Sequence, residues 1–115
     1  MKRLSILLFS LVIISTSCNK PKSENLATLK QLYKTYKNGE ISECTYKNKT
    51  VFTASLNAYD AGSIIFDKDG NSIGNCNWAW GSVDSICNEL KNCKIVYCVK
   101  DNIWGHNYVD KYDLD

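Results

Sequence analysis

The pattern of apolar and polar positions predicts one amphipathic helix in the first third of the chain. Its apolar residues recur at steps of three and four, with lysines between them, as on one face of a helix. They are Leu26, Leu29, Leu32, Tyr33 and Tyr36. Ser23 is a residue type that begins helices, and Gly39 is one that ends them.

The segments that follow have the β-branched and aromatic content of strands. Residues 41–46 and 50–57 flank the polar Lys47-Asn48-Lys49 and predict a hairpin. Residues 63–66 and 72–74 predict a second hairpin. Each pair of strands is joined by a short polar turn, so we expect antiparallel neighbours.

The turn of the second hairpin reads DKDGN, in which Gly70 supplies the positive φ that a tight turn needs. Its other residues resemble the first ligands of a calcium loop: Asp67, Asp69 and Asn71. A calcium loop, however, needs Gly at its sixth position and Glu at its twelfth. Ser72 and Trp78 hold these positions, so we do not predict calcium binding.

A second, shorter helix is predicted over residues 83–92, with Ser82 as its cap and Asp84 near the positive end of its dipole. Residues 94–99 predict a strand, and the apolar residues of 101–115 have no regular spacing. The resulting order favours an α+β fold. We predict a small antiparallel sheet of about five strands with an N-terminal helix and a second short helix, stapled by disulfides.

The N-terminal residues have the layout of a secretory signal peptide. Two cations precede an apolar run, Leu4 to Ile14, which is shorter than the roughly 20 residues of a membrane-spanning helix. Ser15-Thr16-Ser17-Cys18 resembles the lipobox of bacterial lipoproteins, above all those of Bacteroidota. The alternative is an ordinary signal peptide whose cysteine joins a disulfide. The expected division is a lipoprotein signal peptide over 1–17, a lipidated Cys18 and tether over 18–23, and a single globular domain over 24–115.

The charge balance argues against nucleic acid as a partner. Cleavage before Cys18 removes Lys2 and Arg3, which leaves twelve Lys against twelve Asp and Glu. A nucleic-acid-binding protein has a basic patch or stripe instead. Lys20 and Lys22 stand where surface-exported lipoproteins of Bacteroidota carry acids. We therefore expect a protein in the cell envelope that binds the lipid bilayer through acylated Cys18 and faces the periplasm from the outer membrane.

Five cysteines remain beyond Cys18, and cysteines of exported proteins normally pair. They are Cys44, Cys76, Cys87, Cys93 and Cys98. One must stay unpaired or pair with another chain. Because four cysteines allow three connectivities, the five choices of the odd cysteine leave fifteen arrangements.

The Cα separation that a disulfide allows excludes some of these fifteen arrangements. Cys87 and Cys93 are six residues apart, about 9 Å along an intact helix, which exceeds the roughly 4.4–6.8 Å that separates Cα atoms in disulfides. They are not expected to pair with each other. Cys76, which leads into the predicted helix, is expected to pair with one of them, and Cys44 and Cys98 can join across the sheet.

No metal, cofactor or catalytic motif is evident. Zinc sites favour closely spaced cysteine pairs, whereas the spacing here is C-x10-C-x5-C-x4-C. His106, the single histidine, lies far from any nucleophile motif. A cysteine paired with His106 stays open as an alternative.

The aromatic residues are better candidates for binding. Trp78 and Trp80 point the same way if their segment is extended, and Trp104 and His106 share a loop. Such residues anchor protein partners or stack on sugars, and the alternative is that they form the core. We expect Trp104 to be more exposed than Trp78.

Two stretches carry a family resemblance. Asp84-Ser85-Ile86 resembles the O-glycosylation motif of exported Bacteroidota proteins, which makes Ser85 a glycosylation candidate. The run from Tyr59 to Leu90, with KDNIWG and VDKY after it, resembles a group of small Bacteroidota lipoproteins of unknown function. The likeness spans residues 39–112. It implies a lipobox and a single domain, and it implies no activity.

Three classes of function follow from these observations. The first is a non-enzymatic, lipid-anchored envelope module that binds a protein, as an inhibitor or an immunity factor. The second is a module that binds glycan or peptidoglycan through Trp78, Trp80 or Trp104. The third, which the residues favour least, is a cysteine-dependent enzyme that uses His106.

Overall fold

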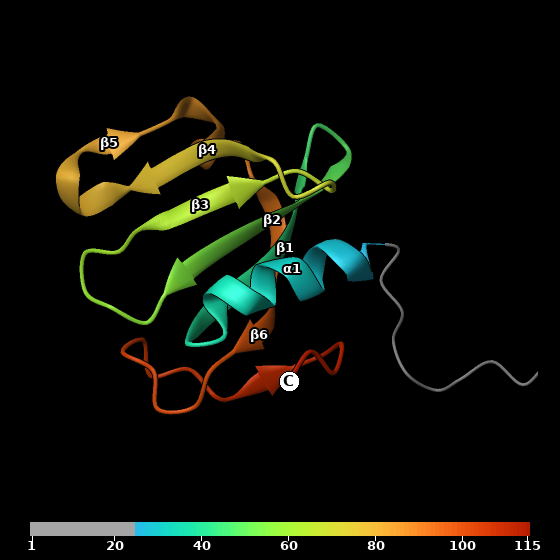
Figure 1. Ribbon diagram of the computed structural model, residues 1–115. Helices are drawn as coiled ribbons and strands as arrows, with labels where there is room; N and C mark the ends of the chain where they lie inside the picture. Colours follow the sequence, from blue (N-terminus) through green and yellow to red (C-terminus); the bar gives the residue numbers. More distant parts are fainter. Residues whose placement is uncertain (1–24) are drawn as a thin grey trace, which may run out of the picture.

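The computed structural model describes residues 25–115. Seven strands form one antiparallel sheet in the order β5-β4-β3-β2-β1-β6-β7 (Figure 1). The predicted α+β fold is confirmed, and the strands beyond the expected five are the two-residue strands β5 and β7. The elements are α1 (Leu26–Tyr36), β1 (Gly39–Tyr46), β2 (Lys49–Leu56), β3 (Ser63–Phe66), β4 (Ser72–Asn77), the 3₁₀ turn η1 (Trp78–Trp80), β5 (Ser82–Val83), the 3₁₀ turn η2 (Ser85–Asn88), β6 (Lys91–Cys98) and β7 (Val109–Asp110).

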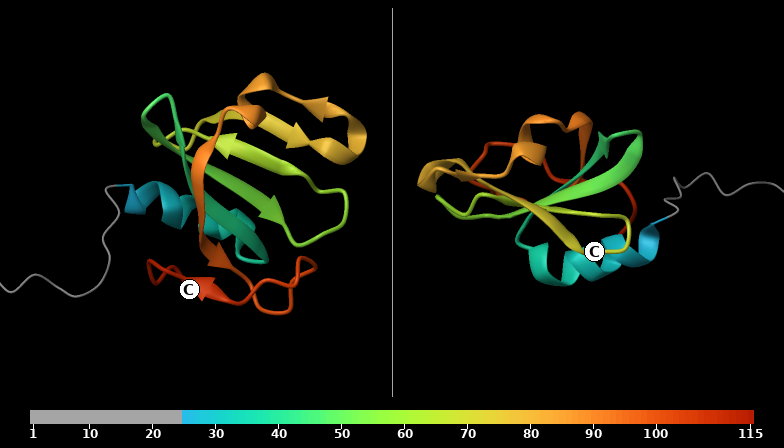
Figure 2. Two further views of the ribbon diagram at one scale, coloured as in Figure 1. Left: turned by 180° about the vertical axis from the view of Figure 1, so that it is seen from behind. Right: turned by 90° about the horizontal axis from the view of Figure 1, so that it is seen from above.

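Helix α1 lies across one face of the sheet (Figure 2). Its predicted apolar stripe is confirmed, since the buried residues of the helix are Leu29, Leu32 and Tyr36. They pack on side chains of β1, β2 and β6 to form a first core. Its sheet residues are Ile41, Phe52, Ala54, Val96 and Tyr97.

Gly39 is not the helix end that the sequence predicts. The C-cap of α1 is Lys37, whose carbonyl accepts a hydrogen bond from the Tyr97 hydroxyl, and Gly39 is the first residue of β1. A Cβ atom at Gly39 would lie 2.0 Å from the carbonyl oxygen of Ser55. Glycine is therefore required there by the close approach of β2. The predicted cap, Ser23, lies outside the described residues.

Both predicted hairpins are confirmed. Lys47 and Asn48 have φ values of 47° and 62°, as a two-residue type I′ turn requires. In the β3–β4 turn Gly70 has φ 87°, and the Asp67 carboxylate accepts a hydrogen bond of 2.9 Å from the backbone N–H of Asn71. That bond is the main reason why the pKa of Asp67 is lowered. The carboxylate that resembled a calcium ligand thus stabilises its own turn.

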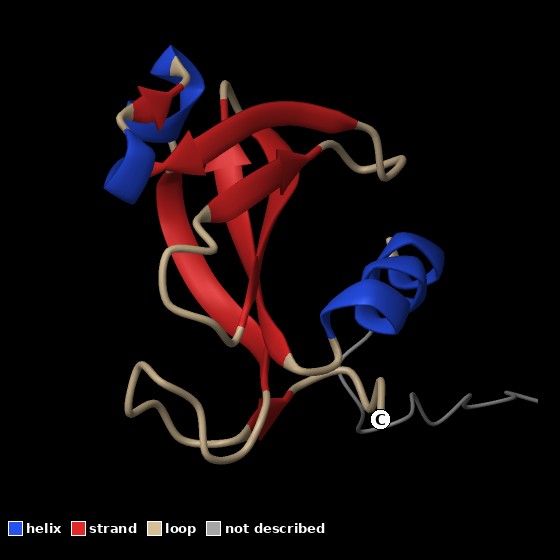
Figure 3. Cartoon of the chain, turned by 60° about the vertical axis from the view of Figure 1, so that its left-hand side comes forward, coloured by secondary structure: helices blue, strands red, loops and turns tan. Residues whose placement is uncertain are grey.

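The opposite face of the sheet carries a second core. Its buried residues are Cys44, Val51, Ile65 and Cys76. The segment that contains η1, β5 and η2 lies on this side, away from α1 (Figures 2 and 3), and its residues Ile86, Cys87 and Leu90 pack on the second core.

The predicted helix over residues 83–92 is wrong. The segment forms β5 and the single turn η2, and β6 begins at Lys91. Tertiary bonds override the helical period here. Cys87 is bonded to Cys76, the Asp84 carboxylate accepts a hydrogen bond from Asn75, and Cys93 is bonded to Cys44. Ser82 belongs to β5 and is not a helix cap.

The expected Cys44–Cys98 disulfide is also wrong. A register shift between β1 and β6, with Asn92 at φ 53°, brings Cys93 to Cys44, and these two form the disulfide. Cys98 lies opposite Glu40 instead. That position is four residues along β1 from Cys44, or roughly 13 Å at the rise of a strand.

We expect Gly74→Ala to lower the free energy of unfolding by about 1–3 kcal/mol, as overpacking in a core does. A Cβ atom at Gly74 would lie 2.5 Å from Cγ2 of Ile86, so it would push η2 off the second core. Urea unfolding of the oxidised protein measures the loss. In an Ile86→Ala background the same substitution should cost less, because the clashing methyl is gone. Equal losses in the two backgrounds would contradict this contact.

Candidate functional site

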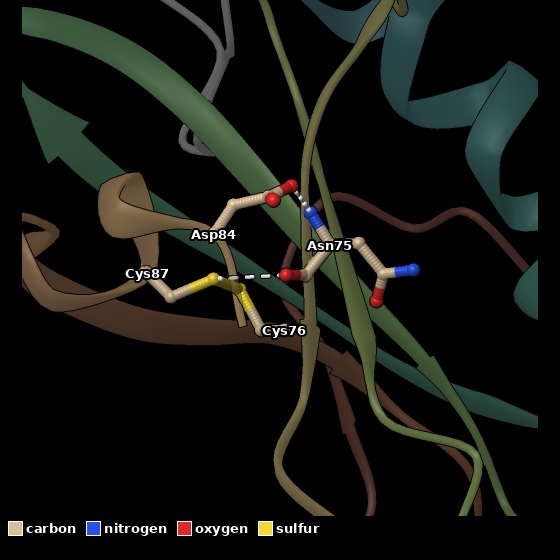
Figure 4. The surroundings of a disulfide bond; sticks show 4 residues. All are labelled: Asn75, Cys76, Asp84 and Cys87. Atoms are coloured by element: carbon tan, nitrogen blue, oxygen red, sulfur yellow. Dashed lines mark hydrogen bonds between the residues drawn. A yellow bond between two sulfur atoms is a disulfide. The ribbon is translucent and has the colours of Figure 1, made fainter. Parts of the chain in front are cut away.

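Residues 75–90 form a stapled corner at the end of β4 (Figure 4). Its disulfide joins Cys76 to Cys87, with the Cα atoms 5.8 Å apart, which confirms the prediction that Cys76 pairs with Cys87 or Cys93. The backbone of Asn75 is held twice. Its N–H donates to the Asp84 carboxylate at 2.8 Å, and its carbonyl accepts from the Asp84 N–H at 3.0 Å. The corner therefore turns the chain back over the second core.

The turn η1, inside the stapled corner, presents Trp78 to solvent. Residues 78–80 are a 3₁₀ turn, so the expectation of an extended segment with two aligned tryptophans is wrong. Trp78 is 64% exposed, whereas Trp104 is half-buried. The expectation that Trp104 is the more exposed of the two is therefore also wrong. The side chain of Trp80 lies outside what the structure describes.

Trp78 borders an open groove of about 430 Å³. Three segments meet there: the loop after β2, the end of β4 with η1, and the loop after β6, which all lie at the same end of the molecule (Figures 1 and 2). Of the large exposed apolar side chains, Leu56 (46%), Tyr59 (81%) and Trp78 line this groove. Ile103 and Trp104 also line it. We call these five residues and the space between them the aromatic groove.

Side-chain amides hold the walls of the aromatic groove together. The backbone N–H of Ile103 donates to Oδ1 of Asn57 at 2.8 Å, which ties the loop after β6 to the loop after β2. Nδ2 of Asn77 donates to the carbonyl of Asp60 at 3.4 Å, which ties β4 to the same loop. These hydrogen bonds join walls that come from distant parts of the chain.

The loop after β6, residues 99–108, is organised by one side chain, Asn102. Its Oδ1 accepts hydrogen bonds from the backbone N–H groups of Trp104 at 3.2 Å and His106 at 3.0 Å. Its Nδ2 donates to the carbonyls of Val99 at 2.9 Å and His106 at 2.8 Å. The loop thus closes around its own asparagine and sets the positions of Trp104 and His106, whose rings stack at 6.2 Å between centroids.

The same loop brings His106 to the free cysteine of the described residues, Cys98. Nδ1 of His106 lies 2.8 Å from Oε2 of Glu40, and the Cys98 thiol donates to the same oxygen at 3.6 Å. Cys98 is fully buried. Burial, and then the charge of Glu40, raise the pKa of its thiol to about 11. Within residues 25–115, these three side chains are the metal-ligating types whose ligand atoms converge.

This arrangement differs from that of an activated cysteine. A nucleophilic thiol needs a lowered pKa or a base that takes its proton, and here a carboxylate lies beside both the thiol and the imidazole. The thiol is protonated at neutral pH and buried, so it is not placed for attack on a substrate in solution.

Ser85, the glycosylation candidate, is the first residue of η2 and is exposed. This exposed position is compatible with glycosylation of Ser85, which stays a prediction.

Five residues of these two sites were not candidates from the sequence: Glu40, Leu56, Tyr59, Asn102 and Ile103. Asn102 had a readable signal, because asparagine side chains commonly accept a hydrogen bond from the backbone two residues on. Glu40 and Tyr59 had none. Glu40 acquires its role from the strand opposite, and Tyr59 from the exposure of its loop.

Comparisons with family models, curated proteins and solved structures found no match for the chain. Within residues 25–115, no helix has the length and apolarity needed to cross a membrane.

A peptide map should find Cys44 linked to Cys93 and Cys76 linked to Cys87, with Cys98 as a free thiol. Because Cys98 is fully buried, a thiol reagent should modify it only after the oxidised protein is unfolded in guanidinium. Alkylation under native and denaturing conditions, followed by mass spectrometry, measures both properties. A Cys98-containing disulfide, or rapid native labelling at Cys98, would contradict the structure.

Proposed function

We propose that this protein is a lipid-anchored, non-enzymatic binding module of the bacterial cell envelope, which holds a protein partner in the aromatic groove. The observation that carries the proposal is the collection of exposed Leu56, Tyr59 and Trp78 around one groove. Large exposed apolar side chains that gather in one place are characteristic of interaction sites. Tryptophan and tyrosine are also the residues that most often dominate binding energy.

The apolar area that Trp78 and Tyr59 expose is large enough to support a specific contact. Covering the exposed part of a tryptophan side chain removes on the order of 100 Å² from water, which contributes about 3 kcal/mol. Tyr59, at 81% exposure, has a comparable area to offer. Two such anchors, in walls that hydrogen bonds join, offer the apolar area that is typical of a hot spot in a protein–protein interface.

A protein partner fits the groove better than a glycan. A sugar site combines an aromatic platform with side chains that converge to hydrogen-bond the hydroxyls. The amides beside this groove hold its walls: Asn57 accepts from Ile103 and Asn77 donates to Asp60. The exposed ring of Trp78 still makes glycan or peptidoglycan binding the second candidate.

A non-enzymatic role is supported by the state of Cys98. The cysteine-dependent alternative requires a reactive thiol next to His106, and burial keeps this thiol protonated.

The envelope location rests on the N-terminal sequence and on the disulfides. Two disulfides join four of the five described cysteines, and disulfides persist mainly in oxidising compartments. The signal peptide over residues 1–17 and the lipobox at Cys18 lie outside the described residues. With Lys20 and Lys22 after the anchor, we place the protein on the periplasmic side of the outer membrane.

Cys18→Ala should abolish lipidation, because the thiol of this residue is the proposed site of acylation. Labelling of cells with an alkyne-modified palmitate, followed by purification, measures it. Cys98→Ala serves as the matched control and should keep its label. Label that persists in Cys18→Ala would contradict the anchor.

Trp78→Ala should weaken partner binding by at least tenfold, in line with the loss of a hot-spot residue, while thermal stability stays unchanged because the side chain is exposed. The measurement is quantitative mass spectrometry of proteins that co-purify from native envelope. Tyr108→Ala is the matched control, since Tyr108 is 42% exposed and does not line the groove.

The proposal predicts one protein that co-purifies with the wild type and with Tyr108→Ala, and is lost with both Trp78→Ala and Tyr59→Ala. A set of co-purifying proteins that is identical for all variants would refute a protein site in the groove. Saturable quenching of tryptophan fluorescence by muropeptides, absent in Trp78→Ala, would favour the glycan alternative instead.

A further inference from the structure

Three side chains from distant parts of the chain converge beside the aromatic groove. Oε2 of Glu40, Sγ of Cys98 and Nδ1 of His106 all lie within 4.8 Å of one another. Oε2 of Glu40 is central, at 2.8 Å from Nδ1 of His106 and 3.6 Å from Sγ of Cys98. A carboxylate, a thiol and an imidazole are thus brought to one point, which is open to solvent on the side of His106.

The backbone explains why the first two ligand atoms meet. Glu40 of β1 and Cys98 of β6 are direct partners in the antiparallel register, and side chains of direct partners lie on the same face of the sheet. Both are held in a sheet that is anchored by the first core. Their separation is therefore fixed by the fold, as a rigid ligand pair requires.

The third ligand is placed by Asn102. This side chain bonds both backbone groups of His106. Its Nδ2 also lies 3.3 Å from Sγ of Cys98, and because its two hydrogens serve the carbonyls of Val99 and His106, a hydrogen bond to the sulfur is shared with one of these carbonyls. A neighbouring N–H group that donates to a cysteine sulfur is typical of metal-bound thiolates, because it stabilises the negative sulfur and orients it. Asn102 therefore has the position of an outer-shell residue to the other three.

We propose that Glu40, Cys98 and His106 bind one divalent transition-metal ion of the zinc type. Thiolate, imidazole and carboxylate are the ligands that zinc takes in proteins, at about 2.0–2.3 Å. Tetrahedral bonds of that length separate neighbouring ligand atoms by about 3.3–3.8 Å. The three atoms lie near this arrangement already, and the exposed His106 ring can make the remaining adjustment.

The charge and proton balance of binding is simple. The thiol of Cys98 loses its proton to solvent as the metal–sulfur bond forms, and Glu40 binds as a carboxylate. The proton that lies between Nδ1 of His106 and Glu40 leaves that nitrogen, and the imidazole binds through Nδ1 as the neutral tautomer protonated at Nε2. Two negative ligands then neutralise the dication. Three protein ligands leave a fourth coordination position open, either to water or to a coordinating side chain of a partner bound nearby.

Trp104 connects this site to the aromatic groove, because its ring stacks on His106 and it lines the groove. Metal binding would fix the loop that carries both. Metal binding does not require a partner in the groove, because Glu40, Cys98 and His106 do not line it.

The test uses Co²⁺ as a spectroscopic probe and Zn²⁺ as a competitor, with the oxidised full chain. Every sample carries Cys18→Ser, so that Cys98 is the one free thiol. We expect one Co²⁺ per chain, with a thiolate-to-cobalt charge-transfer band in the near ultraviolet that one equivalent of Zn²⁺ removes. The absence of that band, or Co²⁺ binding without it, would overturn the proposal.

Variants assign the ligands. Cys98→Ala should lose the charge-transfer band, and His106→Gln, which alters an exposed side chain and leaves the core intact, should weaken Co²⁺ binding at least tenfold. Asn102→Ala should weaken it by about 10–100-fold, as outer-shell changes do. Glu43→Gln is the matched control for Glu40→Gln on the same strand and should bind as the wild type does. Equal affinities for wild type, His106→Gln and Glu40→Gln would overturn the proposed ligand set.

Discussion

The structure depends on one constraint, which is that the central strands β1 and β2 bury apolar side chains on both faces. Ile41, Phe52 and Ala54 point to one side, and Cys44 and Val51 to the other. A sheet of this kind needs a layer on each face. Helix α1 supplies the first layer. The second layer is the stapled corner, which is too short and too polar to stay in place by packing alone.

The disulfides compensate for that weakness. Cys44–Cys93 spans 49 residues and Cys76–Cys87 spans 11, for which loop entropy suggests stabilisation of about 4 and about 3 kcal/mol. Both lie in or beside the second core, which has fewer buried residues than the first. The same corner ends in η1, so the bonds that cover the core also present Trp78 at the aromatic groove. Stability and the proposed binding surface therefore share one segment.

The sequence predicted what local patterns determine. The stripe of α1 and the two hairpins follow from periodicity and turn chemistry. Cys76 was expected to pair with Cys87 or Cys93 because it leads into their segment, and it pairs with Cys87. The start of β6 could not be predicted from local patterns, because bonds to residues outside the segment override the helical period of Val83 to Leu90. The error in β6 led directly to the wrong partner for Cys44.

The candidate metal site was hidden for a related reason. Closely spaced ligands are neighbours in sequence, whereas Glu40 and His106 are 66 residues apart. They meet only because of the β1–β6 register and the loop that Asn102 closes. The register has no sequence signal, and the asparagine that closes the loop indicates a turn without indicating which strand the loop approaches. The exposed position of Trp78 depends in the same way on a 3₁₀ turn that only the disulfide-bonded corner imposes.

The central claim is that the stapled corner is a separate layer over the second core. Hydrogen exchange of the wild type and of Cys76→Ser/Cys87→Ser, compared segment by segment, tests it most directly. The account predicts that residues 75–90 lose protection in the variant, while α1 and the β1–β2 hairpin keep theirs. Unchanged protection in the corner, or an equal loss across the sheet and α1, would contradict it.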